Sequence, residues 1–243
     1  MAPMAPGRIA LGPLDRSRPA PRQVFASIRR AIIALELKPN QSISENEVAT
    51  ALEISRTPVR EAFIRLIEEG LLVSFPQIGT FIAPISLRGL HQAQFLREAV
   101  ECACTEQAAR RCDVEAAAEL ALSMQRHREA HASGDLAAFH RCDEDMHRMI
   151  CDISGFPDIW PTIVETRGHL DRVRQLDLPD TGAAMEVLEQ HAGIIEAISA
   201  NDAAIATKRM RRHLRRVLDR LDIVEKHHPD FFKLKIPQRR RTA

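Results

Sequence analysis

Four side chains that can bind a metal ion interrupt apolar stripes in three helical stretches of the chain. Asp143 and His147 lie on one stripe, His191 lies on a second and His213 on a third. Asp143 and His147 are four residues apart, so they point the same way from a helix. A lone histidine on such a stripe is usually a hydrogen-bonded core residue, but burying these groups unpaired on three stripes would be costly. One carboxylate and three imidazoles suit a divalent ion such as Zn, Ni, Mn or Co.

Other histidines give weaker signals. His127 and His131 are also four residues apart, but no third ligand accompanies them. We therefore do not assign them to the metal. His140 borders the Asp143 face, and His169 lies two helical stretches away from His213; both are candidates for the lining of a pocket.

A second chemical signal is the stretch SRTPVREAF, residues 55–63. Helix N-termini favour acidic residues, yet this helix begins with Arg56 and Arg60 on one face. Ser55 or Thr57 can cap it, and a proline in the first turn costs nothing. A rigid helix start with two guanidinium groups and two hydroxyls fits the major groove of DNA, where arginine reads guanine.

The alternative for these arginines is a solvated face or pairing with Glu53 and Glu61. The surrounding elements favour the DNA interpretation. Helices are predicted near residues 22–37, 44–52 and 55–70, the second opened by the capping box of Ser44 and Glu47. The strands LLVS and TFIA follow, with Gly79 at their turn. Three helices and a hairpin are the order of a winged helix-turn-helix.

After Ser86 no strand pattern remains. Short breaks with Asp, Asn, Gly and Pro separate six predicted helices, near residues 87–111, 114–132, 135–153, 157–176, 181–200 and 202–226. We therefore predict a mostly α protein, an N-terminal winged helix-turn-helix followed by an all-α six-helix bundle. The predicted domains are a flexible arm at 1–20, the winged domain at 21–85, the bundle at 86–228 and a basic tail at 229–243.

Charge is distributed unevenly along the 243 residues. Residues 86–207 carry a net charge of −10, and residues 208–243 carry +9. An acidic middle excludes DNA binding by bulk charge, so a local surface must make the contact. The chain has no run long enough to cross a membrane and no signal-peptide core, and its five cysteines have no zinc-ribbon spacing. We expect a cytoplasmic protein with reduced thiols.

Residues 22–84 resemble the N-terminal domain of the GntR family of bacterial transcriptional regulators. The strings SRTPVREA and LIEEGLL…GTFIA carry this resemblance. It implies a homodimer on a palindromic double-stranded operator, with the helix that starts at Ser55 in the major groove. It also implies a wing, including Gly79 and Thr80, at the minor groove. Pro76-Gln77-Ile78 in this wing lacks the usual basic residue, so fewer phosphate contacts and weaker salt dependence are expected.

The bundle is similar to the FCD domain of the FadR-type subgroup, with a helix number like the VanR-type branch. The motif is carried by DEDMH at 143–147, EQHAGII at 189–195 and MRRHL at 210–214, so the resemblance spans about residues 22–226. It implies a metal that helps to bind a small organic-acid effector. Arg97 matches an arginine that meets the effector carboxylate; its alternative is a surface pair with Glu101. Phe156 replaces the usual asparagine and is expected to reshape the pocket.

The leading hypothesis is a DNA-binding transcriptional repressor, not an enzyme, controlled by a small carboxylate at a Zn, Ni or Mn site. A rival from another class is a di-iron carboxylate enzyme, since Glu144-x-x-His147 and Glu225-x-x-His228 have the required spacing. The bridging glutamates of such an enzyme are not on apolar stripes, and no nucleophile–base arrangement is evident. A third hypothesis keeps the regulator and makes the metal purely structural.

Overall fold

The computed structural model describes residues 12–177 and 181–235. Residues 1–11 of the predicted arm, Pro179 and residues 236–243 of the predicted tail lie outside this range. The chain forms two compact units. One contains the chain up to Gly89 and from Glu225 onward, and the other contains Leu90–Val224. Each unit is described by itself below.

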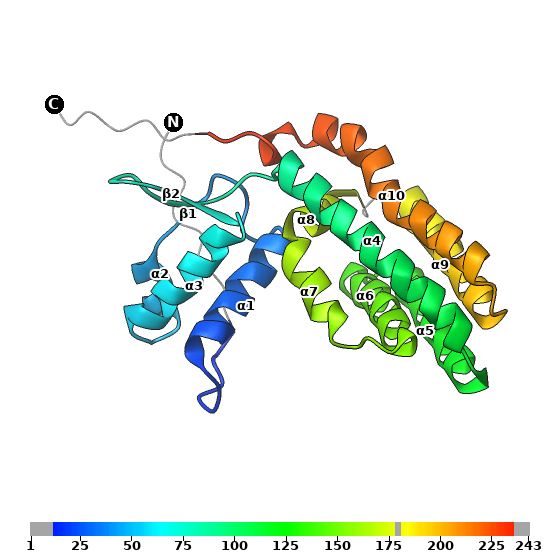
Figure 1. Cartoon of the computed structure of the whole chain (residues 1–243). Coiled ribbons are helices and arrows are strands. Elements are labelled where there is room, and N and C mark those ends of the chain that lie inside the picture. Colours follow the sequence, from blue (N-terminus) through cyan, green and yellow to red (C-terminus); the bar gives the residue numbers. More distant parts are fainter. Residues whose placement is uncertain (1–11, 178–180, 236–243) are drawn as a thin grey trace. The chain divides into compact units, whose positions relative to one another are not determined.

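The first unit is the expected winged helix-turn-helix (Figure 1). Its elements are α1 (Ala20–Ile33), β1 (Ser42–Ile43), α2 (Glu45–Ala51), α3 (Arg56–Glu68), β2 (Leu72–Phe75) and β3 (Gly79–Ile82). The three strands form an antiparallel sheet in the order β1-β3-β2. The sequence did not predict β1, because two residues are too few to show the alternation typical of a strand.

Apolar faces of α1 and α3 form the core of this unit. Val24, Ile28 and Ile32 of α1 are fully buried, as are Val59 and Leu66 of α3. The capping box at the start of α2 is present as predicted. One detail differs from expectation. α1 ends four residues earlier than predicted because the chain turns through a positive φ at Leu35.

The second unit is all helical, as predicted. Its helices are α4 (Leu87–Arg111), α5 (Val114–Ser133), α6 (Leu136–Ser154), α7 (Ile159–Thr166), α8 (Gly168–Asp177), α9 (Thr181–Ser199) and α10 (Ala203–His227). The first residues of α4 and the last of α10 belong to the first unit. A short 3-10 helix, η1 (Pro229–Phe231), follows α10. No helix in the described part of the chain is long and apolar enough to cross a membrane.

The stretch predicted as one helix near 157–176 is divided into α7 and α8 at Arg167. The Arg167 side chain is 1% exposed. Its Cζ lies 4.7 Å from the centre of the Trp160 ring, and its Nε lies 3.1 Å from Asp171 Oδ2. The carbonyl of Arg167 accepts the first hydrogen bond of α8, from the Asp171 amide. Gly168 has the greatest backbone freedom of any residue, so the chain can turn at this point at little steric cost.

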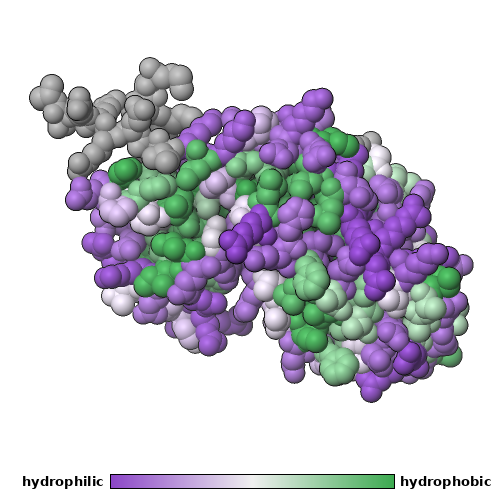
Figure 2. Space-filling view, turned by 45° about the horizontal axis from the view of Figure 1, so that its top comes forward, coloured by the Kyte–Doolittle hydropathy of each residue, from purple (hydrophilic) through white to green (hydrophobic). Residues whose placement is uncertain are grey.

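The core of the bundle is filled by apolar side chains of α4, α5, α6, α9 and α10, including Leu120, Phe139, Ile194 and Met210. Green hydrophobic patches also reach the surface among hydrophilic residues on the face shown in Figure 2. The four expected metal-ligand residues lie within the bundle, where Asp143 is 1% exposed.

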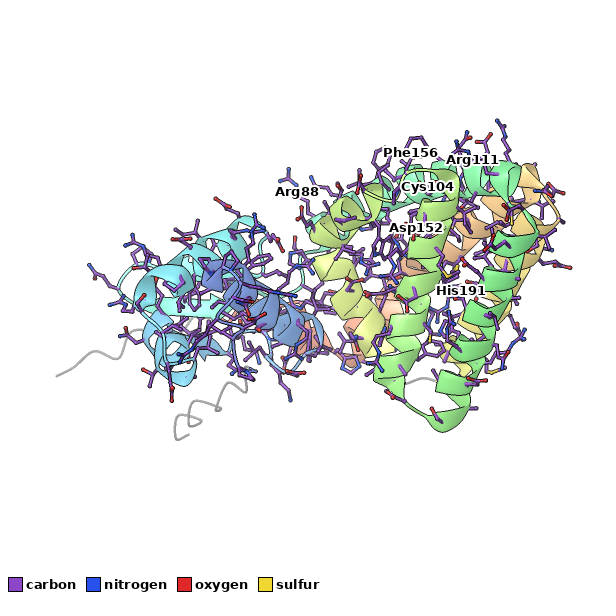
Figure 3. The ribbon with its side chains drawn as sticks, turned by 90° about the horizontal axis from the view of Figure 1, so that it is seen from below. Arg88, Cys104, Arg111, Asp152, Phe156 and His191 are labelled. Carbon is purple, nitrogen blue, oxygen red and sulfur yellow. The ribbon has the colours of Figure 1, made fainter. Side chains whose placement is uncertain are left out.

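Two glycines end helices in the left-handed conformation but differ in their surroundings. Gly134 follows α5 at φ +72°, and a Cβ there would meet nothing within 4 Å. Gly155 follows α6 at φ +89°, and a Cβ there would lie 1.7 Å from Arg111 Nη1. That nitrogen donates to the Ser154 carbonyl at 2.6 Å. Figure 3 shows Arg111 near Phe156 at one end of the bundle.

We predict that Gly155→Ala destabilises the protein more than Gly134→Ala. Both alanines must adopt a positive φ, at a cost of about 1 kcal/mol or more. Only the Gly155 variant must also displace the Arg111 guanidinium. Urea unfolding of the two single variants, and of both in an Arg111→Ala background, measures the difference. Equal losses at the two glycines, or no relief of the Gly155 loss by Arg111→Ala, would contradict this explanation.

Candidate metal centre and nucleic-acid interface

Three helices bring the four predicted ligand residues together. Asp143 and His147 come from α6, His191 from α9 and His213 from α10. One ligand atom from each lies within 4.8 Å of every other, and all four side chains are buried. Figure 3 shows His191 between the helices of the bundle. The sequence placed these residues on three stripes, and the packing of α6, α9 and α10 turns them toward one point.

The spacing of the nitrogen atoms matches that of ligands on one ion. His213 Nε2 lies 3.2 Å from His147 Nε2 and 3.2 Å from His191 Nε2. With metal–nitrogen bonds of about 2.0–2.1 Å, two nitrogens on one tetrahedral or octahedral ion lie about 2.8–3.4 Å apart. Asp143 Oδ1 is 3.6 Å from His191 Nε2. It has no hydrogen-bond partner among the described residues, although it is buried.

The outer ring nitrogens have partners that determine the tautomers. His147 Nε2 lies 3.2 Å from Arg97 Nη2, which can only donate, and His147 Nδ1 lies 2.5 Å from Glu101 Oε2, which as an ionised carboxylate can only accept. His213 Nδ1 lies 3.0 Å from Gln190 Oε1. The Gln190 amide is oriented by its Nε2, which donates to Glu186 at 3.0 Å. Both histidines therefore carry their proton on Nδ1, and their Nε2 lone pairs point inward.

His191 completes this arrangement through a histidine outside the predicted set. Its Nδ1 lies 3.3 Å from Nδ1 of His127, which is 1% exposed and packs on Phe139. When His191 donates this proton, all three Nε2 atoms present lone pairs to one another. Such a cluster has no internal hydrogen bonds to offset the burial of its nitrogens, whereas a cation would satisfy all of them.

Burial and neighbouring charges keep these groups in the protonation states that a metal requires. Burial lowers the pKa of His191 and His213 well below the usual histidine value, so both stay neutral. Burial also lowers the pKa of His127 to about 4. Burial alone would raise the pKa of Asp143, but the positive charge of Arg174 outweighs burial and holds that pKa well below its ordinary value. The carboxylate is therefore ionised, as a ligand must be.

Arg97 lies at this cluster and not on the surface. It is 3% exposed, its Nε donates to Glu101 at 2.5 Å, and its Nη2 lies 3.2 Å from His147 Nε2. Burial would raise the pKa of Glu101, but Arg97 and His147 outweigh burial and lower it to about 2. The alternative role considered for Arg97 was a surface ion pair with Glu101. Glu101 is indeed its partner, but the pair is buried beside the candidate metal ligands and not on the surface.

The space beside the cluster is small, and charged side chains of both signs line it. A cavity of about 20 Å³ is bordered by His213, by Arg97, Arg174 and Arg216, and by Asp177, which pairs with Arg216. Arg174 also donates to Asp143 Oδ2. One turn before Arg97 on α4, Gln94 is 3% exposed, and neither of its amide atoms has a hydrogen-bond partner among the described residues. A cavity of this size holds about one water molecule, so a larger ligand requires side chains to move.

Sequence reasoning missed several residues that shape this site, namely Glu101 as a histidine partner, His127, Arg174 and Gln190. His127 has ligand spacing to His131, but the sequence showed no third ligand for that pair. Arg174 lies in a segment whose packing no motif reveals. One expectation is not met, because Phe156 is 54% exposed at the end of α6. Glu144, which belonged to the rejected di-iron alternative, has a half-exposed side chain that binds Arg167. Neither residue lines the cavity beside the cluster.

The second candidate site is the start of α3 in the winged unit. Ser55 is the N-cap residue, but its hydroxyl makes no capping hydrogen bond. The expectation that Ser55 or Thr57 caps the helix is therefore not met for Ser55, and its hydroxyl is exposed. Arg60 is exposed one turn later. Arg56 pairs with Glu45 of α2 at 3.0 Å, rather than with Glu53 or Glu61, and its side chain is 66% exposed.

The hairpin of β2 and β3 has the short turn expected of a wing. Residues 76–78 connect the strands, with Phe75 opposite Gly79 and Ser74 opposite Thr80. Gly79 has φ +138°, a conformation that favours glycine, and Gln77 also has a positive φ. The Thr80 hydroxyl donates to Ser74 Oγ at 3.3 Å across the strands. Polar side chains of the turn and of β3 are thus presented beside each other.

Two protein-family models match this chain. Residues 21–82 match the model described as bacterial regulatory proteins, gntR family, and residues 93–216 match the FCD domain. These ranges contain the start of α3 and the four clustered ligand residues, respectively.

Similar proteins are named as HTH-type transcriptional regulators. An HTH-type transcriptional regulator in an unstable DNA locus of Streptomyces ambofaciens is 36% identical over 87% of this chain and 89% of its own length. The HTH-type transcriptional repressor RspR of Escherichia coli is 29% identical over 90% of this chain and 96% of its own.

Solved structures show the same fold. E. coli McbR/YncC aligns with a TM-score of 0.70 at 18% identity, covering 86% of this chain and 98% of its own. A putative GntR regulator from Rhodococcus aligns with a TM-score of 0.66 at 22% identity, covering 82% and 97%. Together with the winged unit and the helical bundle, the family matches lead to one conclusion: this chain is a DNA-binding transcriptional regulator of the GntR family, with an FCD domain, and not an enzyme.

Proposed function

We propose that this regulator is a repressor whose operator binding is controlled by a small organic acid at a divalent metal in the bundle. The observation that carries the metal proposal is the convergence of the three Nε2 atoms, with each Nδ1 facing a partner. Repression is supported by the printed names of relatives, which include the RspR repressor and a probable D-xylose utilization operon repressor.

The DNA contacts are assigned to the start of α3 and to the wing. Arg56 and Arg60 project from the first two turns of α3 and can read base edges, while Ser55 and Thr57 can hold phosphates. Gly79 and Thr80 place the wing backbone against the minor groove. Glu45 neutralises Arg56 in the free protein, so Arg60 is the clearer candidate for direct readout.

We predict that Arg60→Ala weakens binding to the operator by about 1–3 kcal/mol and relaxes the preference at one base pair of each half-site. Fluorescence anisotropy with a duplex selected by the wild-type protein from a random pool measures the affinity. Repeating the selection with the variant measures the preference. Arg128→Ala removes the same charge from an exposed position on α5 and is expected to have little effect. Wild-type affinity and base preference in Arg60→Ala would refute the assignment.

A homodimer is proposed because one winged domain buries too little surface for tight operator binding. The bundle offers a surface for this contact between α4 and α10. Two adjoining hollows of about 390 and 460 Å³ lie there, floored by small residues such as Ala99, Ala103 and Ala204. Phe95, at the edge of the first hollow, is 79% exposed. Glu98 already pairs with Arg215 and Arg211 of α10, which reduces the cost of covering this rim.

We predict that Phe95→Ala weakens the dimer at least tenfold. A two-fold interface contains the residue twice, and each buried phenyl ring contributes about 1–2 kcal/mol or more. Sedimentation equilibrium measures the dissociation constant. Phe156→Ala, which removes an exposed phenyl ring at the end of α6, serves as the matched control and should leave the dimer intact. A monomeric wild type, or equal loss in both variants, would rule out this surface.

The effector is placed beside the metal ligands, where basic and unpaired polar groups meet. When bound, a dication there supplies open coordination positions for a carboxylate oxygen. Arg97 can donate to the same carboxylate from its position 3.2 Å from His147 Nε2. The amide of Gln94 can satisfy a second polar group of the acid. Arg97 also pairs with Glu101. The effector would therefore bind an arginine that Glu101 already holds in position.

We predict that the protein binds one equivalent of Zn or Ni and that this raises its melting temperature, because the unfolded chain has no preformed site. His191→Ala combined with His213→Ala should abolish both effects and leave the winged unit folded. Elemental analysis of protein purified without a chelator or His tag gives the stoichiometry. Thermal melts of EDTA-treated protein with and without added metal give the stabilisation.

The effector is tested on metal-loaded protein with a screen of small organic acids by thermal shift. Arg97→Lys keeps the charge next to Glu101 but loses the planar guanidinium, so it should retain metal and lose the shift caused by the acid. A metal that binds while no acid shifts the melt would favour a purely structural ion. No metal, and melts that do not respond to Zn or Ni, would leave only hydrogen-bonded core histidines.

A further inference from the structure

The chain after α10 returns to the winged unit as a strap, which we define as residues 229–235. The Phe231 carbonyl accepts a hydrogen bond from the Ile85 amide at 2.8 Å. Both polar atoms of the Asn40 side-chain amide form hydrogen bonds with the strap. Its Nδ2 donates to the Lys233 carbonyl at 3.0 Å, and its Oδ1 accepts from the Lys235 amide at 2.8 Å. All of these groups belong to the first compact unit.

Asn40 is itself fixed to the wing. It adopts φ +64°, and its backbone amide donates to the Ile82 carbonyl at 2.9 Å. The Ile82 amide in turn donates to the Gln41 carbonyl at 2.9 Å. Ile82 is the last residue of β3, the strand that begins with Gly79 and Thr80. A single residue therefore joins the strap to the strand that forms one side of the wing.

The other end of the strap is continuous with a ligand helix. α10 runs without interruption from Ala203 to His227 and contains neither glycine nor proline. It carries His213, and the stripe that follows, Leu214, Val217, Leu221 and Val224, is buried. The fourteen steps from His213 to His227 span about 21 Å at about 1.5 Å per residue. One unbroken helix therefore connects His213 to the residue two positions before the strap.

We propose that Asn40 is a positioning residue, and that the strap it holds transmits the state of the metal site along α10 to the wing. This inference rests on the proposed metal at His213 but adds the route by which that metal affects DNA binding. Three hydrogen bonds hold the strap, and through Asn40 they influence the position of β3. Because the site is partly exposed, these bonds are weak enough for the strap to be released.

The test compares operator affinity with and without Zn in the wild type and in Asn40→Gly. Glycine tolerates φ +64° but has no amide to hold the strap. The probe is the duplex selected by the wild-type protein. We expect Zn to change wild-type affinity by about fivefold or more, within the usual range of coupling between sites. We call the operator affinity with Zn divided by the affinity without Zn the Zn ratio. In Asn40→Gly the Zn ratio should lie within about twofold of one, while the Zn affinity measured by calorimetry stays near the wild-type value.

Asn201→Gly is a matched control. Asn201 also has a positive φ, at +57°, and its amide donates to two backbone carbonyls, of Ala109 and Cys112, at 2.8 and 2.9 Å. Its replacement removes the same kind of clamp from the bundle and leaves the strap intact. A second variant, Lys235→Pro, removes the amide that donates to Asn40 Oδ1, together with the exposed ion pair between Lys235 and Asp230, and keeps the bond from Asn40 Nδ2 to the Lys233 carbonyl. It should lower the effect of Zn on operator affinity partway.

The possible outcomes separate the two proposals. If calorimetry detects no Zn binding to the wild type, the metal proposal fails and the strap has no signal to transmit. If Zn binds and alters wild-type affinity, but Asn40→Gly keeps the wild-type ratio, the strap proposal is wrong and the metal proposal stands. If Zn binds but does not change the operator affinity of the wild type, the strap proposal is also wrong and the metal proposal stands. A ratio lost in Asn40→Gly and Lys235→Pro, and kept in Asn201→Gly, supports the strap.

Discussion

The bundle depends on a constraint that apolar packing alone cannot meet: three imidazole nitrogens with their lone pairs inward, and one carboxylate, lie together in its core. His147 and His213 give their protons to outer acceptors, so the inner nitrogens cannot bond to one another. Desolvation makes such a cluster costly. The cost is met from outside by Glu101, Gln190 and His127, which fix the rings, and by Arg97 and Arg174, which keep the carboxylates ionised.

In the proposed mode of regulation, the same residues would serve both regulation and stability. Arg97 neutralises Glu101, Glu101 orients His147, and the Arg97 guanidinium reaches the inner nitrogen of that histidine. A ligand that binds Arg97 thus changes the surroundings of a metal ligand directly. α10 carries the last ligand at His213 and then continues into the chain that returns to the winged unit. One helix therefore belongs both to the site and to the connection with the DNA-binding unit.

The proposed DNA interface requires little positive charge because the contacting groups are concentrated in a small area. The middle of the chain is strongly acidic, and the winged residues 1–85 carry a net charge of only +2. α3 opens with an N-cap hydroxyl that makes no capping bond and with two exposed arginines, so backbone amides, hydroxyls and guanidinium groups face one way. A local surface of this kind suits sequence reading better than strong, salt-dependent attraction to any DNA.

The sequence by itself determined the winged helix-turn-helix, the all-α bundle and the identity of the four ligand candidates, because helical periodicity and capping are local properties that a stripe of side chains records. It could not show β1, whose two residues have no pattern of their own, or the division of one predicted helix at Arg167. Nor could it show that Arg97 and Glu101 are buried, that His127 supports His191, or that Asn40 holds residues almost two hundred positions away. Those facts depend on which helix faces pack together, and only the tertiary structure decides this, because contacts between distant segments leave no period in the sequence.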